Sequence, residues 1–246
     1  MTKFLFLLFC GFMSVAGCNQ NLKPDDGNVC STLIASGTTG TLTWVLYEDG
    51  TLTISGEGEM PDYYYDFVNE EIHNPAPWYD YQDNIVAVII GDEVENIGRE
   101  AFHFCFEMKT VYVGSSVTVI GREAFSICEN LASVNIPNSV TYIDYAAFYG
   151  CTNLSSVSIG KSASIGGSTF RSCPNLNKII VYQKIPQVIQ VGTSSGGHGM
   201  HGWVYSSHPF IGVDRDNCTL LVPAGSEEAY RNAEVWNYFV NIKAIQ

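Results

Sequence analysis

Four cysteines recur at nearly equal intervals in the middle of this chain, and they limit what it can fold into. The intervals are 23, 23 and 22 residues, between Cys105, Cys128, Cys151 and Cys173. Each cysteine lies in the frame I-G-x-x-A-F-x-x-C, with few substitutions, and L-x-x-V-x-I and a turn follow it. Two copies share the six letters IGREAF, at 97–102 and 120–125. A period of this length predicts a solenoid of stacked units.

The end of each copy alternates between apolar and other residues with a period of two. This alternation predicts a strand with one buried face. A unit of 22–23 residues cannot bury its apolar face alone, but stacked units can. We therefore expect a mainly β fold with short helical turns. It should be a solenoid of about four to five rungs, of which a half copy at 85–91 is the first.

The frames A-F-x-x-C and L-x-x-V-x-I resemble the BspA-type leucine-rich repeat of bacterial surface proteins. Residues 44–56 and 76–79 resemble the segment that often precedes such repeats, and residues 218–242 resemble their C-terminal unit. The likeness covers most of 37–246 and departs at 192–209. It implies a leucine-rich repeat solenoid, display on the cell surface and binding of host or microbial macromolecules. It implies no catalysis.

The N-terminus predicts export. Lys3, an apolar run from Phe4 to Phe12 and small residues after it are typical of a secretory signal. The sequence Val-Ala-Gly-Cys at 15–18 resembles the lipobox of bacterial lipoproteins, in which Cys18 would carry the lipid. An ordinary signal peptide that contains a cysteine is the alternative. We expect a lipoprotein signal peptide at 1–17 and a protein anchored by its lipid to the bacterial outer membrane or cell surface.

The remaining chain divides into five expected parts. These are a lipidated flexible tether at 18–30, an N-terminal β cap at 31–84, the solenoid at 85–191, a Gly/Ser/His loop at 192–204 and a C-terminal cap at 205–246. Caps are needed because terminal rungs would otherwise expose apolar and strand edges. Asp49-Gly50 predicts a hairpin in the first cap. Ser226 is expected to cap a short helix that begins with Glu227 and Glu228.

The charge balance excludes one class of partner. The chain has a formal net charge of −13, which becomes about −14 once Lys3 leaves with the signal. A field of this sign repels phosphate backbones, so we expect no nucleic acid partner. Contact with a membrane should come only through the lipid anchor.

Motifs for catalysis are missing from the sequence. It has no G-x-S-x-G elbow, P-loop or H-E-x-x-H motif. Adjacent acids such as Glu70-Glu71 and Asp92-Glu93 are expected to be solvated. The repeat cysteines are expected to pack as small apolar groups, although the spacing of neighbouring rungs does not exclude disulfides. We expect no enzyme.

No metal or cofactor is expected either. His198, His201 and His208 could supply ligands, but they lie in a stretch rich in glycine and serine, for which a surface loop is the simpler interpretation. Asp214–Asn217 resembles half of a calcium loop without its later glutamate, and a turn explains it better.

The candidate binding surface is the outward face of the repeat strands. If the Leu, Val and Ile of each rung point inward, the residues between them face solvent. These are Ile89, Thr110, Tyr112, Ser133, Asn135, Ser156, Ser158, Lys178 and Ile180, with Ala87 beside the first. A solvated sheet face without a ligand is the alternative.

A second candidate surface is aromatic. It comprises Tyr63, Tyr64, Tyr65, Phe67 and Tyr81. Exposed aromatic rings could stack on sugars or anchor a protein. Covering the first rung is the other interpretation, with Trp78 as the surest core member.

These observations predict a non-catalytic adhesion protein that binds a macromolecule, a protein before a glycan. The alternative is a carbohydrate-binding accessory protein or a glycan-degrading surface lipoprotein. Arg and Glu of IGREAF are replaced in later copies, so we expect them to be unconstrained. Gly98 and Gly121 are expected to permit tight turns.

Overall fold

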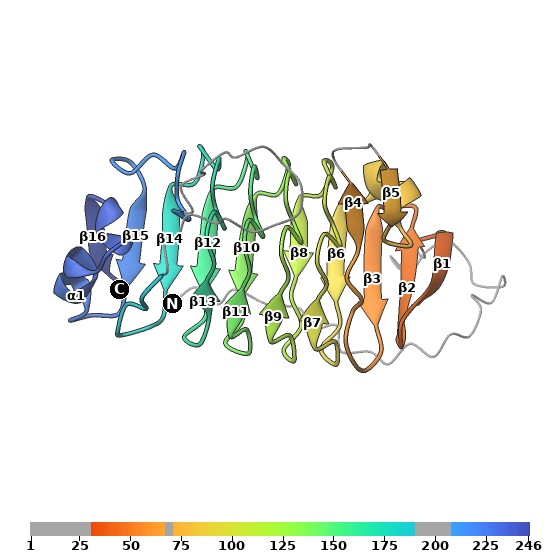
Figure 1. The fold of residues 1–246 in the computed structure, drawn as a ribbon, viewed down its shortest axis with the longest axis horizontal. Coiled ribbons are helices and arrows are strands. Elements are labelled where there is room, and N and C mark those ends of the chain that lie inside the picture. Colours follow the sequence, from red (N-terminus) through yellow and green to blue (C-terminus); the bar gives the residue numbers. More distant parts are fainter. Residues whose placement is uncertain (1–30, 67–70, 190–207) are drawn as a thin grey trace, which may run out of the picture.

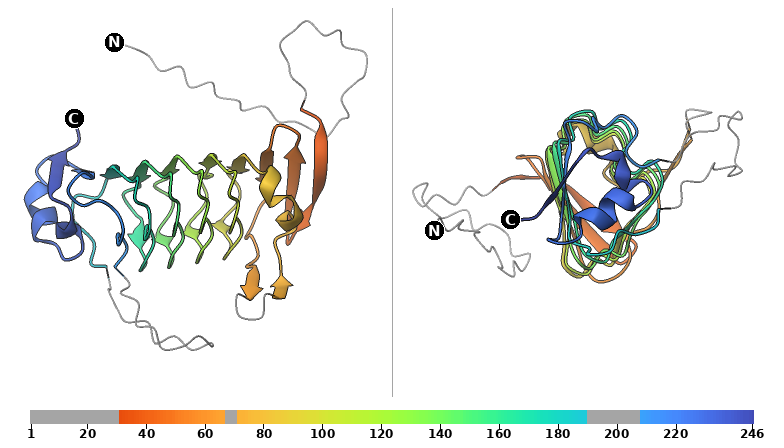
Figure 2. Two further views of the ribbon diagram at one scale, coloured as in Figure 1. Left: turned by 90° about the horizontal axis from the view of Figure 1, so that it is seen from above. Right: turned by 90° about the vertical axis from the view of Figure 1, so that its left-hand side faces the viewer.

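The computed structural model describes residues 31–66, 71–189 and 208–246. The chain winds into an elongated stack in which the rungs superpose when viewed along the long axis (Figure 1, Figure 2). One long sheet of ten strands runs the length of the stack, in the order β1-β2-β3-β6-β8-β10-β12-β14-β15-β16. A smaller sheet, β13-β11-β9-β7, is formed by the second short strand of four rungs. The expectation of a mainly β solenoid is confirmed.

The strands of the long sheet are β1 (Leu33–Thr39), β2 (Leu42–Tyr47), β3 (Thr51–Ser55), β6 (Ala87–Ile90), β8 (Thr110–Tyr112), β10 (Ser133–Ile136), β12 (Ser156–Ile159), β14 (Lys178–Val181), β15 (Thr219–Val222) and β16 (Asn241–Ala244). Those of the small sheet are β7 (Asn96–Ile97), β9 (Val119–Ile120), β11 (Tyr142–Ile143) and β13 (Ser164–Ile165). A separate hairpin pairs β4 (Tyr64–Asp66) with β5 (Glu71–Asn74) and projects from the side of the stack (Figure 2). The helices are the 3-10 helices η1 (Tyr79–Asn84) and η2 (Trp236–Tyr238) and the α-helix α1 (Glu227–Asn232). Among the described residues, none of these helices has the length and apolar character needed to span a bilayer.

Parallel register places equivalent repeat positions next to one another. Val134 pairs with Val157, and Ile136 with Ile159, so each inward residue stacks on its counterpart one repeat later. The sheet is parallel from β3 to β16, and only β1, β2 and β3 pair antiparallel. Both caps therefore continue the ladder of the repeats and cover their edges.

A column of aromatic rings forms the centre of the core. Phe102, Phe125 and Phe148 stack with centroids 5.3 and 5.2 Å apart and ring planes 9° and 8° from parallel. Phe170 continues the column at 5.5 Å. All four rings are fully buried. The phenylalanine of the repeat frame is thus the position at which adjacent rungs interlock.

The column extends one rung beyond the expected repeats. Phe210 stacks on Phe170 at 5.9 Å and 3°, and the Phe170 amide donates to Pro209 O at 2.8 Å. Phe210 in turn meets Trp236 and Phe239 of the C-terminal cap, at 5.6 and 4.9 Å. Residues 209 onward therefore supply a rung that the sequence frame did not reveal.

The repeat cysteines are buried free thiols, in agreement with the packing interpretation and not with disulfides. Three of them donate their S–H to the carbonyl of the preceding rung's phenylalanine. Cys128 bonds Phe102 O at 3.1 Å and Cys151 bonds Phe125 O at 3.2 Å. Each thiol thus gives a hydrogen bond to a buried carbonyl, and Phe102 O also accepts the Cys105 amide at 3.3 Å.

Gly98 and Gly121 begin the expected tight turns, since the Ala101 amide donates to Gly98 O at 3.4 Å and the Ala124 amide to Gly121 O at 3.2 Å. Glycine itself is required there for close packing. Neither Gly98 nor Gly121 has a positive φ. A Cβ on Gly98 would lie 1.9 Å from Pro61 O, and one on Gly121 would lie 2.8 Å from Arg99 N. Contacts that short cannot be accommodated, so a side chain here would push the rungs apart.

Two features of the caps were expected. The hairpin joined through Asp49-Gly50 is confirmed, since β2 pairs antiparallel with β3. The short helix α1 begins at Glu227 as expected, with Glu228 in its first turn. Ser226 occupies the N-cap position, but its side chain makes no capping hydrogen bond, so that part of the expectation was wrong.

Candidate binding surfaces

The outward residues of the repeat strands form two parallel rows, which we call the outer strip. In the first row, register partners follow one another in the order Ala87, Thr110, Ser133, Ser156 and Lys178. The second row contains the partners Ile89 and Tyr112, and farther along the partners Asn135, Ser158 and Ile180. Ser156, Ser158 and Ile180 are half-buried, and most of the others are exposed. The structure therefore brings the first predicted set together on one face.

The end of the outer strip near the N-terminal cap is apolar. Ile89 and Tyr112 are register partners, and they are 40% and 53% exposed. The Tyr112 hydroxyl donates to Asp92 Oδ1 at 3.2 Å, and the same oxygen accepts the Ser115 amide at 2.8 Å. These hydrogen bonds, the backbone one first, lower the pKa of Asp92. The tyrosine ring is thus held in place beside an exposed isoleucine.

The second predicted surface is divided by the fold. Tyr63 is 4% exposed, bonds Thr39 at 2.6 Å and packs on Trp78, so it cannot meet a ligand. Tyr81 is half-buried against the core. Tyr64 remains 44% exposed. Phe67 lies outside the described residues. Most of this aromatic cluster covers the first rung, and Trp78, at 1% exposure, is the core member that was expected.

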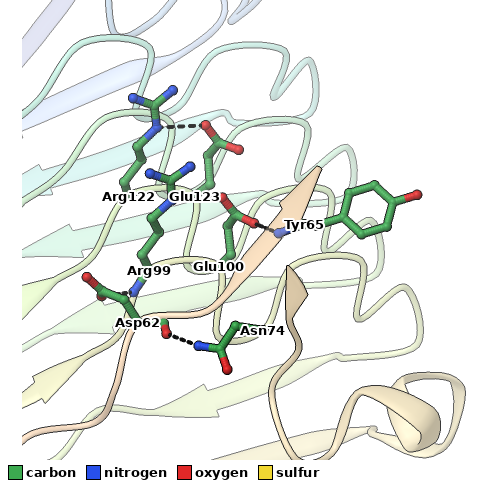
Figure 3. A network of polar contacts seen from close by, with 7 residues as sticks. All are labelled: Asp62, Tyr65, Asn74, Arg99, Glu100, Arg122 and Glu123. Carbon is green, nitrogen blue, oxygen red and sulfur yellow. Dashed lines mark hydrogen bonds and ion pairs between the residues drawn. The ribbon is translucent and has the colours of Figure 1, made fainter. Parts of the chain in front are cut away.

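The first IGREAF copy fastens the β4–β5 hairpin to the stack (Figure 3). Glu100 Oε2 accepts the Tyr65 amide at 2.8 Å, while Oε1 accepts Nε of Arg99 at 2.8 Å. The Arg99 amide donates to Asp62 Oδ1 at 2.7 Å, and Asn74 Nδ2 donates to Asp62 O at 2.9 Å. The Glu100 side chain is 3% exposed. The expectation that Arg and Glu are unconstrained was therefore wrong for this copy.

The second copy forms the same ion pair without a hairpin to hold. Arg122 Nε donates to Glu123 Oε1 at 3.0 Å, and these side chains are 46% and 16% exposed. The guanidinium lies 5.0 Å from the centre of the Tyr145 ring in the next rung. The same Arg-Glu pair thus has different partners in the two copies, because the first copy contacts the N-terminal cap and the second contacts a further repeat.

A small cavity beneath the hairpin is bordered by three groups whose pKa is shifted by burial. It has a volume of about 20 Å³, and Glu100, His103 and Cys105 are among its lining residues. Burial raises the pKa of Cys105 to about 12, lowers that of His103 to about 4 and raises that of Glu100. A cavity of this size holds about one water molecule. These shifts report a packed interior and not a site open to substrate.

A groove runs over the turns of the later rungs, and we call it the turn groove. At equivalent positions Glu123 is followed by Ala146 and then Ser168, with φ of 55°, 55° and 56°. The short side chains that replace glutamate leave a space of about 290 Å³, also lined by Tyr145 and Tyr149. The Arg122 guanidinium lies over the Tyr145 ring. Sequence comparison of the rungs at this position could have revealed the groove.

A second hollow, which we call the edge hollow, lies where the outer strip meets the turn that follows it. It has a volume of about 500 Å³ and is lined by Asn135, Ile136, Pro137, Asn138, Gly160, Lys161 and Tyr182. Tyr182 is 47% exposed and stands where the other rungs have Gly91, Gly114, Pro137 or Gly160. That exchange of a small residue for tyrosine was the available sequence signal.

The remaining candidates give no ligand set. In the described parts of the chain, no three His, Cys, Asp or Glu side chains lie close enough to hold a metal. His208 is half-buried against Tyr238, 4.9 Å between ring centres. Asp214 accepts the amides of Asp216 and Asn217, which makes it a turn residue. His198, His201, Cys18, Cys30 and Glu70 lie outside the described residues.

The fold defines the protein as a capped solenoid of leucine-rich repeats. Residues 76–191 match the BspA type leucine rich repeat region in 6 copies, so this segment is a region of BspA-type repeats. The count slightly exceeds the four to five rungs expected from the sequence.

Several bacterial structures are similar to this chain. A leucine-rich repeat protein from Eubacterium ventriosum is 31% identical, over 60% of this chain and 44% of that one, with a TM-score of 0.44. A leucine rich cell surface protein from Faecalibacterium prausnitzii is 21% identical, over 86% and 55%, with a TM-score of 0.43. The pneumococcal vaccine antigen PcpA is 16% identical, over 80% and 51%, with a TM-score of 0.46. This chain thus spans about half of each relative's length. No curated protein matches it.

Proposed function

We propose that this protein is a non-catalytic adhesion protein of the bacterial cell surface, which binds a partner protein through the outer strip. Cys18 carries the lipid that anchors it to the outer membrane or cell surface, and residues 18–30 form the tether. The region of BspA-type repeats supports surface display. The signal-like residues 1–17 and the Val-Ala-Gly-Cys sequence support the anchor.

The observation that carries the proposal is the Ile89–Tyr112 pair. Two large apolar side chains stand side by side on an ordered sheet, at 40% and 53% exposure. Aromatic side chains held in place are the commonest anchors of protein interfaces, because they bury much area at little entropic cost. The polar residues of the following rungs then act as the rim.

The absence of catalysis is supported by where the reactive groups lie. The turn groove has a single lining carboxylate, Glu123, and it is engaged by Arg122. Glycoside hydrolysis needs two carboxyl groups that face each other across a cleft. The buried Cys105 borders a cavity too small for a substrate, and His103, which also lines the turn groove, is only 8% exposed.

The test is a binding assay on the mature chain. The chain is presented to a panel of purified host matrix proteins, and affinity is measured for any protein retained. Tyr112→Ser should weaken binding at least tenfold, because it removes the anchor ring. Tyr142→Ser is the matched control, since Tyr142 is 40% exposed but lies in the small sheet. Equal losses in both variants would exclude the outer strip.

The anchor is tested separately by Cys18→Ala. The variant should be released from the membrane fraction, whereas the parent chain stays there. A variant that remains in the membrane after signal cleavage would refute lipidation at Cys18.

Carbohydrate recognition is the second candidate function. The observation that favours it is the edge hollow, where the exposed Tyr182 ring borders polar side chains. Aromatic rings of this kind stack on sugar rings, and amides bond their hydroxyls. A glycan array with the parent chain and Tyr182→Ala tests this candidate. Hydrolysis of any glycan, lost on one carboxylate substitution, would instead show the glycan-degrading alternative.

A further inference from the structure

The edge hollow exists because the β14 rung carries a large side chain where earlier rungs carry small ones. The Tyr182 amide donates to Ile159 O at 3.1 Å, as the Gly160 amide donates to Ile136 O at 3.0 Å, so the two residues occupy the same place in successive rungs. A Cβ on Gly160 would lie 2.5 Å from Pro137 O. Gly160 therefore cannot fill the space, and the Tyr182 ring borders it.

The two asparagines of the edge hollow each accept a hydrogen bond through the side-chain oxygen. Asn135 Oδ1 accepts the hydroxyl of Ser158, and Asn138 Oδ1 accepts the Lys161 amide at 2.9 Å. The backbone donor of Lys161 fixes which atom of the Asn138 carboxamide is the oxygen. No hydrogen bond from either side-chain amide nitrogen to another described residue is present. Both asparagines therefore keep side-chain N–H donors for a ligand.

Lys161 adds a positive charge to these donors. Its side chain forms no ion pair with an acidic side chain among the described residues, although the chain has 25 acidic and 12 basic residues. No Asp or Glu lines the edge hollow. The Tyr182 hydroxyl can donate or accept. The remaining polar side chains that line the hollow thus offer donors and a cation, in a protein whose overall field is negative.

We propose that the edge hollow binds a carboxylate-bearing sugar residue of an acidic glycan, an inference that rests on carbohydrate recognition as the second candidate function. The sugar ring stacks on the exposed Tyr182 side chain. The carboxylate binds Lys161 and the amide of Asn138, and Asn135 donates to a ring hydroxyl. A neutral sugar would use the ring but leave the ammonium group without an anion.

Two sources of such a carboxylate are distinguished by the probes. Oligomers of galacturonic acid test uronic acids, and sialyllactose tests sialic acids. Neutral galactose oligomers and lactose are their matched controls. At least one acidic probe should bind tenfold or more tightly than its control, and added salt should reduce that preference because the contact is ionic.

Substitutions test which residues cause the preference for acidic over neutral sugars. Lys161→Gln should remove the preference for the acidic probe and leave weak binding of the neutral one. Tyr182→Ala should abolish both. Lys109→Gln makes the same charge change at an exposed residue two rungs away and should have no effect. Circular dichroism of each variant shows that the fold is kept.

The outcomes separate this inference from the functions on which it is built. Equal binding of acidic and neutral sugars would overturn the carboxylate assignment and leave carbohydrate recognition standing. No sugar binding at all would overturn both. Binding of polyglutamate as tight as that of the uronate oligomer would assign the hollow to acidic peptides and overturn the glycan. Protein binding by the outer strip is untouched by any of these results, because Tyr112→Ser measures it.

Discussion

The indole N–H of Trp78 donates to the carbonyl of Ala101 at 2.8 Å. In every later rung the same carbonyl position accepts a backbone amide, as when the Phe102 amide donates to Ala124 O at 2.8 Å. The Trp78 ring also stacks on that of Phe102, with ring centroids 5.4 Å apart and ring planes 15° from parallel. One side chain of the cap thus replaces both the amide and the ring of a missing rung.

Replacing Trp78 by phenylalanine should reveal how much that hydrogen bond contributes to the free energy of unfolding. Trp78→Phe keeps a ring on the column but leaves the Ala101 carbonyl unpaired, which costs about 1–3 kcal/mol beyond the loss of packing. Trp44→Phe is the matched control, because Trp44 is buried and its indole N–H has no hydrogen-bond partner among the described residues. Urea unfolding of both variants gives the difference. A Trp44 variant that is destabilised as much as the Trp78 variant would contradict this role.

The doubled IGREAF supplies its own control for the hairpin. Glu100→Ala should lower the free energy of unfolding by about 1–3 kcal/mol and speed hydrogen exchange at the Tyr65 amide, because a buried donor loses its acceptor. Glu123→Ala removes a partly exposed ion pair and should cost below about 1 kcal/mol. Equal losses at the two positions would show that the carboxylate does not hold the hairpin.

Stability should fall as the pH drops below about 6.5, and His103 should be one cause. Its pKa is lowered to about 4 by burial, so between the two values the unfolded chain binds a proton that the folded chain does not. From pH 7 to pH 5 this difference amounts to about 2 kcal/mol. The raised pKa of Glu100 acts in the opposite direction, because its folded form holds a proton more tightly. His103→Gln should therefore flatten the loss on acidification, measured by urea unfolding at both pH values, and an unchanged slope would exclude His103.

The rung thiols should resist alkylation in the folded protein. Burial raises the pKa of Cys105 and Cys173 to about 12, and raises those of Cys128 and Cys151 as well. The thiolate is the reactive form, and these side chains are at most 1% exposed. Iodoacetamide at pH 8 should modify all four only in denaturant, as peptide mapping would show. Rapid modification of the native chain would mean that the rungs open locally.

Local chemistry allowed the solenoid to be predicted, because period, alternation and turn residues all describe one repeating environment. The Asp49-Gly50 hairpin, the inward Leu, Val and Ile, and the buried Trp78 follow from it. The sequence could not show which residues from other parts of the chain each repeat residue contacts. Arg99-Glu100 and Arg122-Glu123 are spelled alike, yet only the first pair meets a hairpin.

The additional rung was missed for two reasons that are visible in its residues. Val213 takes the place of the repeat cysteine. The spacing from this position to the inward strand residue is also one longer, because Val213 is seven residues before Leu220 while Cys173 is six before Ile179. The chain between β14 and Phe210 is also longer than in the other repeats. The edge hollow was missed because its walls come from three successive rungs, and only the stacking places Tyr182 beside Gly160 and Asn138.

The aromatic column also makes the length of this protein adjustable. Trp78 packs on Phe102 and Phe210 packs on Phe170, so the contacts of each cap do not depend on the number of phenylalanine rings between them. β8 and β14 are three strands apart, which separates Tyr112 from the rung of Tyr182 by ~14 Å. Deleting or duplicating one repeat would change that spacing by a fixed step and keep each surface intact. The copy number of the repeats therefore sets the distance between Tyr112 on the outer strip and Tyr182 at the edge hollow.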